Sequence, residues 1–196
     1  MLSNEETRLL KGCAKGDSLA QKELYDLFSN DMYKVCLMYS NDNEMASDLL
    51  QEGFLKVFRN IHEFKDIGSL GGWIRKIMIN TCIDFYRVDK WSKYFDSFDD
   101  AINADHASLE IDKNESLNES DFLSITRGLP EGYRLILNLY FLEDYTHPEI
   151  AEELGINIGT SKSQLHKAKK YLKSRLLKML SENEIEEYGG FTKKVV

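Results

Sequence analysis

The stretch HPEIAEELGINIGTSKSQLHKAKKYLK, residues 147–173, decides the fold of this chain. Thr146 and Glu149 have the spacing of a capping box, which predicts a short helix from there to Gly155, a residue suited to the left-handed conformation that closes helices. A second helix is predicted to open at Gly159. Two helices joined by a three-residue turn have the outline of a DNA-reading helix-turn-helix.

The second of these helices reverses the charge of the chain. No acidic residue occurs between Glu153 and Glu182, whereas seven lysines and arginines do, although the whole chain has a net charge of −8. Helical spacing places Ser161, Leu165, Ala168 and Leu172 on one face, which is predicted to pack on the first helix. The side predicted to contact base edges and phosphates carries Thr160, Lys162, Ser163, His166, Lys167 and Lys170. The alternative is that this helix is merely a solvated basic face.

The N-terminal half is predicted to hold four helices. Ser3 with Glu6 and Ser18 with Gln21 read as capping boxes for the first two. The second carries an apolar stripe for about five turns. The third lies within SDLLQEGFLKVFRNI and the fourth runs to about Lys90, and Gly53 inside the third indicates close packing. The stripe of the second helix consists of Leu24, Leu27, Phe28, Met32, Val35, Cys36 and Tyr39.

Between these halves the composition becomes acidic and loses its apolar period. Residues 92–118 contain seven aspartates and glutamates against two lysines, Lys93 and Lys113, which is typical of a flexible linker. Pro130 then precedes another apolar helix. We therefore expect an all-α chain of two small helical domains, 1–91 and 119–182, joined by a flexible acidic linker and followed by a tail, 183–196.

Composition excludes several classes of function. An acidic chain does not coat nucleic acid non-specifically, so any DNA contact must be local. The three cysteines show no zinc-site spacing and are expected to be buried thiols. The four histidines lie in separate segments, so neither a metal site nor a catalytic site is predicted and no cofactor is needed. No signal peptide or apolar run of about 18 residues occurs, which favours a cytoplasmic protein without membrane insertion.

Three segments together resemble extracytoplasmic-function (ECF) sigma factors of the sigma-70 family. Residues 147–173 are similar to the family's C-terminal helix-turn-helix, SDLLQEGFLKVFRNIHEF to its polymerase-binding segment, and LGGWIRKIMINTCIDFYR to the segment that opens and reads the downstream promoter element. The resemblance covers about residues 4 to 180. It implies a transcription initiation factor that binds core RNA polymerase and recognises the −10 and −35 promoter elements.

The resemblance also implies roles for single residues. Asp48, Gln51, Glu52 and Phe54 match positions at or beside those that bind a coiled coil of the polymerase. Asn80 matches the position that recognises an extruded base of the downstream element, and Asp84, Arg87 and Lys90 complete that surface. Each also has a plain structural interpretation as helix polarity or core. Trp73, Phe85 and Tyr86 are expected to belong mainly to the core.

Two positions depart from the family pattern. Ser161 stands where valine is usual, so its buried hydroxyl needs a partner, such as a carbonyl one turn back. Gln164 stands where arginine is frequent, which removes one phosphate contact and could favour an adenine edge. Gln164 is therefore also expected to contact the upstream promoter element.

Two other classes of protein are compatible with parts of this sequence. The chain could be a dimeric helix-turn-helix regulator with an N-terminal sensing domain, which two half-sites in its DNA would reveal. It could also be an enzyme, for which the sequence offers no clustered catalytic residues. The resemblance favours core RNA polymerase, promoter DNA and an anti-sigma factor as partners, with no small-molecule substrate.

Overall fold

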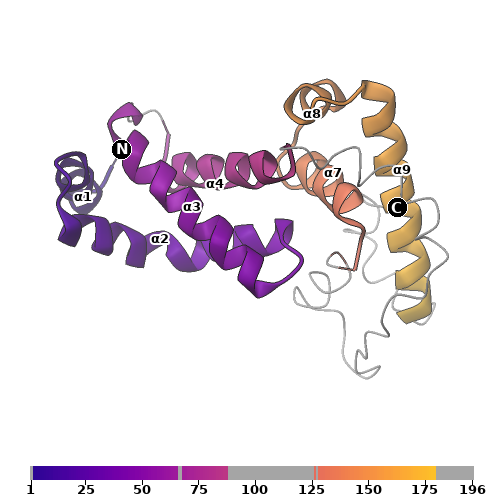
Figure 1. Cartoon of the computed structure of the whole chain (residues 1–196), viewed down its shortest axis with the longest axis horizontal. Coiled ribbons are helices and arrows are strands. Elements are labelled where there is room, and N and C mark those ends of the chain that lie inside the picture. Colours follow the sequence, from indigo (N-terminus) through magenta and orange to yellow (C-terminus); the bar gives the residue numbers. More distant parts are fainter. Residues whose placement is uncertain (1, 66–67, 88–125, 127, 180–196) are drawn as a thin grey trace. The chain divides into compact units, whose positions relative to one another are not determined.

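The chain folds into helices grouped in two compact units, Met1–Phe85 and Tyr86–Val196 (Figure 1). The computed structural model describes residues 2–65, 68–87, 126 and 128–179, and every secondary-structure element in these ranges is a helix. The expected all-α class with two helical domains is confirmed. The predicted linker, the tail and the boundary at residue 91 lie outside the described residues and stay predictions.

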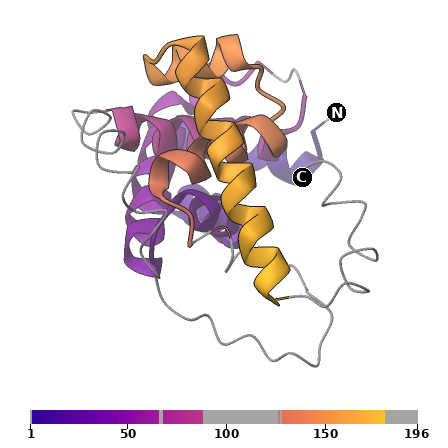
Figure 2. The ribbon, with the colours of Figure 1, turned by 90° about the vertical axis from the view of Figure 1, so that its right-hand side faces the viewer.

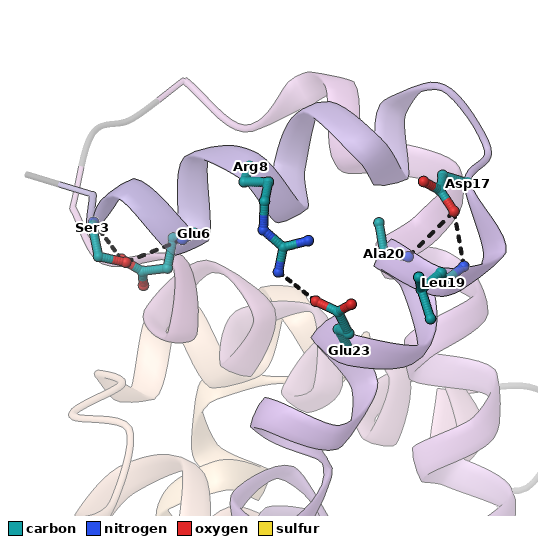
Figure 3. Close-up of polar contacts among 7 residues, drawn as sticks. All are labelled: Ser3, Glu6, Arg8, Asp17, Leu19, Ala20 and Glu23. Carbon is teal, nitrogen blue, oxygen red and sulfur yellow. Dashed lines mark hydrogen bonds and ion pairs between the residues drawn. The ribbon is translucent and has the colours of Figure 1, made fainter.

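The first unit begins with a hairpin of α1 (Asn4–Ala14) and α2 (Ser18–Tyr39), drawn in Figure 3. The predicted capping box is present, since the Glu6 N–H donates to Ser3 Oγ at 3.0 Å and the Ser3 N–H to Glu6 Oε2 at 2.7 Å. The predicted Ser18 box is wrong by one residue, because Asp17 caps α2 by accepting from the N–H of Leu19 at 2.9 Å. A carboxylate at this position also interacts favourably with the helix dipole. The hairpin is tied by an ion pair between Arg8 and Glu23 (Figure 3).

The other helices of this unit are α3 (Asn43–Asn60), the single turn η1 (Ile61–Glu63) and α4 (Leu70–Arg87). A Cβ at Gly53 of α3 would collide with the thioether of Met78 in α4, which confirms the predicted close packing. One member of the predicted α2 stripe, Leu27, is 50% exposed and lies off the core. The most deeply buried apolar residues of the unit include Leu24, Cys36, Val57, Leu70, Ile74, Met78 and Cys82.

The three cysteines are free and buried, as expected. Cys36 of α2 and Cys82 of α4, distant in sequence, hydrogen-bond to each other, and this bond together with burial holds the pKa of Cys82 well above its usual range. Burial likewise raises the pKa of Cys13. The raised pKa values keep the Cys13 and Cys82 thiols protonated, and all three cysteines belong to the core.

The second unit contains α7 (Glu131–Phe141), α8 (His147–Leu154) and α9 (Ile158–Met179). Figure 2 shows α9 as one continuous helix with α8 beside its N-terminal end. Pro130 occupies the cap position of α7. Tyr171 of α9 donates to the Gly128 carbonyl at 2.9 Å. Residues buried in this unit include Leu129, Ile136, Leu139, Ile150, Leu154, Leu165, Ala168 and Leu172.

Candidate nucleic-acid interface

The turn between α8 and α9 is built by local hydrogen bonds. The predicted capping box starts α8, with the Thr146 N–H donating to Glu149 Oε2 at 2.8 Å. Gly155 closes α8 with φ 64° and ψ 32°, the left-handed conformation predicted for it. The Thr160 N–H then donates to Asn157 Oδ1 at 2.7 Å, and α9 begins at Ile158. Sequence reasoning missed this cap, although asparagine is among the residues most favoured there.

The faces of α9 divide as predicted, with one exception described below. Ser161, Leu165, Ala168 and Leu172 are buried, which confirms the packing stripe. The opposite side has exposed Lys162, Ser163, His166 and Lys170, with Thr160 and Lys167 half-buried. Ser163 Oγ donates to the Thr160 carbonyl at 3.0 Å, so this hydroxyl is already oriented along the helix. The structure thus brings six of the seven predicted DNA residues onto the accessible side of one helix.

Gln164 is the exception, because it is buried and does not lie on the accessible side, so its expected contact with DNA stays a prediction. Its side chain is only 7% exposed and its Oε1 has no hydrogen-bond partner. The residue lies beside the packing stripe, where a long side chain folds inward instead of toward solvent. A buried amide oxygen without a partner is destabilising.

Lys169 packs against another helix of the same unit and is not part of the exposed basic side of α9. Its Nζ lies 5.1 Å from the centroid of the Phe141 ring in α7, a distance at which a cation is attracted to an aromatic face. The exposed lysines in the described part of α9 are Lys162, Lys170 and Lys173. Arg175 and Lys178 have side chains outside the described part.

Ser161 finds a partner that the sequence did not suggest. Its buried hydroxyl lies 2.9 Å from Nδ1 of His147, at the start of α8, instead of bonding to a carbonyl one turn back. The His147 ring stacks on Tyr140 of α7, with centroids 5.0 Å apart and an interplanar angle of 30°. Burial and the nearby charge of Lys162 lower the pKa of His147, so its imidazole is kept neutral near pH 7.

The first unit presents a second polar surface on α3. Asp48, Gln51 and Glu52 are exposed, in keeping with the expected contact positions. Phe54 is not, because it is 2% exposed and its ring packs on Tyr25 at 4.7 Å. Phe54 therefore supports the helix from the core, in keeping with its alternative interpretation as a core aromatic, and its expected role at the polymerase contact stays a prediction. The neighbouring Leu55 is 49% exposed and continues the exposed face, a position that sequence reasoning missed.

The third surface lies on α4. Asn80, Asp84 and Arg87 are exposed and share one face at helical spacing, whereas Lys90 lies outside the described residues. Asp84 pairs with Lys56 of α3 at 2.9 Å, so its charge is partly neutralised. Of the aromatic residues expected in the core, Tyr86 is buried, Trp73 is half-buried against Phe64, and Phe85 is 39% exposed.

A surface cavity of about 550 Å³ lies between the α3 and α4 surfaces. Asp48 and Glu52 line one side of it, and Asp84 lines the other. No group of three or more His, Cys, Asp or Glu that could bind a metal occurs among the residues that the structure describes. In the same ranges no helix is both long and apolar enough to cross a membrane.

Known proteins match this chain over both units. The family description "Sigma-70 region 2" matches residues 24–92, and "Sigma-70, region 4" matches residues 121–172. The chain is 29% identical over 153 residues to the ECF RNA polymerase sigma factor SigM of Bacillus subtilis, covering 78% of this chain and 92% of SigM. It is 30% identical over 148 residues to the RNA polymerase sigma factor SigV of the same organism, covering 76% of this chain and 86% of SigV.

Among solved structures the chain is similar to the sigma factor RpoE of Bartonella quintana, crystallised with the anti-sigma factor NepR. The TM-score is 0.47 at 22% identity, over 82% of this chain and 98% of that one.

Sigma-70 region 2 followed by sigma-70 region 4, in a chain whose described elements are all helices, defines the sigma-70 class of transcription factors. Within that class the chain belongs to the ECF RNA polymerase sigma factors. It directs promoter-specific transcription. A dimeric regulator with a sensing domain is not favoured, because the N-terminal half matches sigma region 2.

Proposed function

We propose that the exposed side of α9 binds the upstream promoter element as duplex DNA. The observation that supports this most directly is the separation of charge on α9. Lys162 and Lys170 are exposed on the side away from the packing stripe, in a chain that is acidic as a whole. Such a local basic side suits a helix whose first turns meet base edges while later lysines neutralise phosphates.

The α3 surface is the proposed contact with core RNA polymerase, and the α4 surface the proposed contact with the downstream element. Asp48, Gln51 and Glu52 are accessible and form a continuous acidic and amide face with Leu55 at its end. The exposed Asn80 amide offers a donor and an acceptor to an unstacked base, and Arg87 offers a cation to the backbone. Catalysis of a covalent step is not part of this role.

An anti-sigma factor is a further proposed partner, because ECF sigma factors are commonly restrained by one. Its expected effect is competition with core RNA polymerase in the cytoplasm, where initiation takes place. A host protein that binds the chain and prevents its binding to core polymerase would fit this proposal. A host in which no protein competes with core polymerase would contradict it.

In vitro transcription tests the proposed function. Core polymerase of the host is supplied with host genomic fragments, with and without the chain, and the 5′ ends of the RNA are sequenced. The chain should produce a set of start sites absent from core polymerase alone, with two common sequence elements upstream. Asn80→Ala should lower initiation while binding of upstream duplex by the chain is retained. A set of start sites identical to that of core polymerase alone would contradict the function.

A further inference from the structure

The junction between α8 and α9 contains a buried polar contact. Ser161, in the first turn of α9, is fully buried, and its hydroxyl lies 2.9 Å from Nδ1 of His147. An apolar contact stabilises in proportion to the apolar area that it buries, so a small rotation of the helix changes it little. A hydrogen bond, in contrast, weakens steeply as its angle departs from linearity. The contact therefore constrains how α9 is rotated on α8.

His147 is itself held in place from two other directions. Its ring stacks on Tyr140 of α7, and its backbone lies between Thr146 and Glu149, the two residues of the capping box. The partner of Ser161 is thus anchored to α7 and to the first turn of α8. A donor or acceptor on an immobile ring transmits its own position to the group that it bonds.

The residues next to Ser161 are those proposed to reach DNA. Thr160 precedes it, and Lys162 and Ser163 follow it. At a helix radius of roughly 5 to 6 Å including side chains, a rotation of about 10° moves the outer atoms by about 1 Å. Bidentate contacts to base edges require hydrogen-bond distances within a few tenths of an ångström, so a shift of that size weakens them, while long lysines can still follow the phosphates.

We propose that the hydrogen bond between His147 and Ser161 sets the rotation of α9 on α8, and that His147 is a positioning residue for promoter recognition in this chain. The inference rests on the proposed binding of duplex DNA by α9. The bond is expected to affect the preference for promoter over other DNA. It should not affect non-specific affinity, because the number of lysines that face the phosphates is the same with or without this bond.

The test measures equilibrium binding of full-length variants to two duplexes. One is a promoter fragment from which core polymerase initiates only with the chain, and the other is a scrambled fragment of equal length. His147→Leu keeps much of the bulk without the polar atom, and Ser161→Ala removes the hydroxyl. Each should weaken promoter binding by about three- to tenfold, the worth of one hydrogen bond, and leave scrambled-duplex affinity and the salt slope unchanged. The double variant should be no worse than either single variant, because both remove the same contact.

His147→Asn is the matched control, because its amide can occupy the place of Nδ1 and should retain most of the preference for promoter. Circular dichroism and thermal unfolding show whether each variant is folded at the binding temperature. A purely structural role would lower the unfolding temperature and leave the ratio of the two affinities unchanged. That result, or additive losses in the double variant, would overturn the inference.

Lys162→Ala and Lys167→Ala separate this inference from the proposed function. If these variants weaken DNA binding and the His147 and Ser161 variants keep the wild-type affinity ratio, only the positioning role is overturned. If the lysine variants bind both duplexes like wild type, α9 is not the DNA-binding helix, and both proposals fail.

Discussion

At the scale of single residues, the effect of a buried polar side chain on stability depends on whether it has a hydrogen-bond partner. Ser161 and Gln164 are both buried polar residues on α9; the serine hydroxyl has a partner in His147, whereas Oε1 of the glutamine has none. If the Ser161 hydroxyl were unpaired, replacing Ser161 by valine would be expected to stabilise the chain. Because the hydroxyl is hydrogen-bonded to His147, the change removes that bond, and no stabilisation is expected.

The lowered pKa of His147 predicts a dependence of stability on pH. The unfolded chain binds more protons than the folded one between the lowered pKa and the usual value of about 6.5, so the free energy of unfolding should fall as the pH is lowered through that range. Charged and titratable groups that share its cavity are Tyr140, Asp144, Tyr145 and Lys162. Urea unfolding at pH 7.5 and 5.5 measures the effect.

His147→Asn is the control for this pH dependence, since it removes the titrating ring and should reduce the difference between the two pH values. The lowered pKa of Glu6 and of Glu149 affects stability only below their usual value of about 4.5, outside the range compared. An equal pH dependence in wild type and variant would show that His147 does not cause it.

Loss of one basic residue from the exposed side of α9 should affect DNA binding and not folding. Lys167→Ala is expected to weaken binding to all duplexes and to lower the salt slope by about one ion, whereas Lys162→Ala should cost roughly 1 to 3 kcal/mol at a single base pair if it contacts a base. Fluorescence anisotropy at several salt concentrations measures both. Lys11→Ala, an exposed lysine of α1, is the control and should leave the slope unchanged.

At the scale of elements, the helix ends follow local chemistry and the helix contacts follow steric fit. The capping boxes at Ser3 and Thr146 were predictable because both partners lie three residues apart. The cap of α2 was assigned one residue too late, because Asp17 and Ser18 are both good caps and only the observed backbone distinguishes them. Close approach of α1 to α2 at Gly12 has no local signal at all.

Gly12→Ala should destabilise the first unit. An added Cβ would lie 2.5 Å from the Cβ of Ala20 in α2, so the hairpin would have to open. The gain in helix propensity of about 1 kcal/mol is outweighed by an overpacking cost of about 1 to 3 kcal/mol. Thermal unfolding should show a lower midpoint, and Gly12→Ala combined with Ala20→Gly should restore it. Failure of the second change to restore stability would mean that contact with Ala20 is not the cause.

At the scale of the whole molecule, the proposed surfaces lie on different units. Asp48 and Glu52 are exposed on α3 of the first unit, and the basic side of α9 is in the second. Asp48→Ala with Glu52→Ala should therefore weaken binding of core polymerase and reduce initiation, while duplex affinity measured without polymerase stays at the wild-type value. Both can be measured on the same full-length protein.

Leu27→Ala provides a control for that experiment, because Leu27 is an exposed apolar residue on α2 and not one of the acidic residues of α3. It should leave polymerase binding unchanged. An equal loss of polymerase and DNA binding in a folded double variant would contradict the assignment of the first unit.

The sequence by itself determined the features that depend on neighbours a few residues away. These are the helical class, the capping boxes, the left-handed Gly155, and the separation of the Leu165 and Ala168 stripe from the lysines of α9. Each arises from hydrogen bonds within one turn or from helical periodicity, so spacing along the chain is enough to predict it.

Only the tertiary structure decided which residues at the borders of these stripes are buried and what they meet. It buries Phe54 and exposes Leu55, turns Gln164 inward, and joins Ser161 to His147 and Cys36 to Cys82. These outcomes depend on the rotation of each helix against a partner distant in sequence. Helical spacing does not define that rotation, because it is set by packing of side chains from several elements at once.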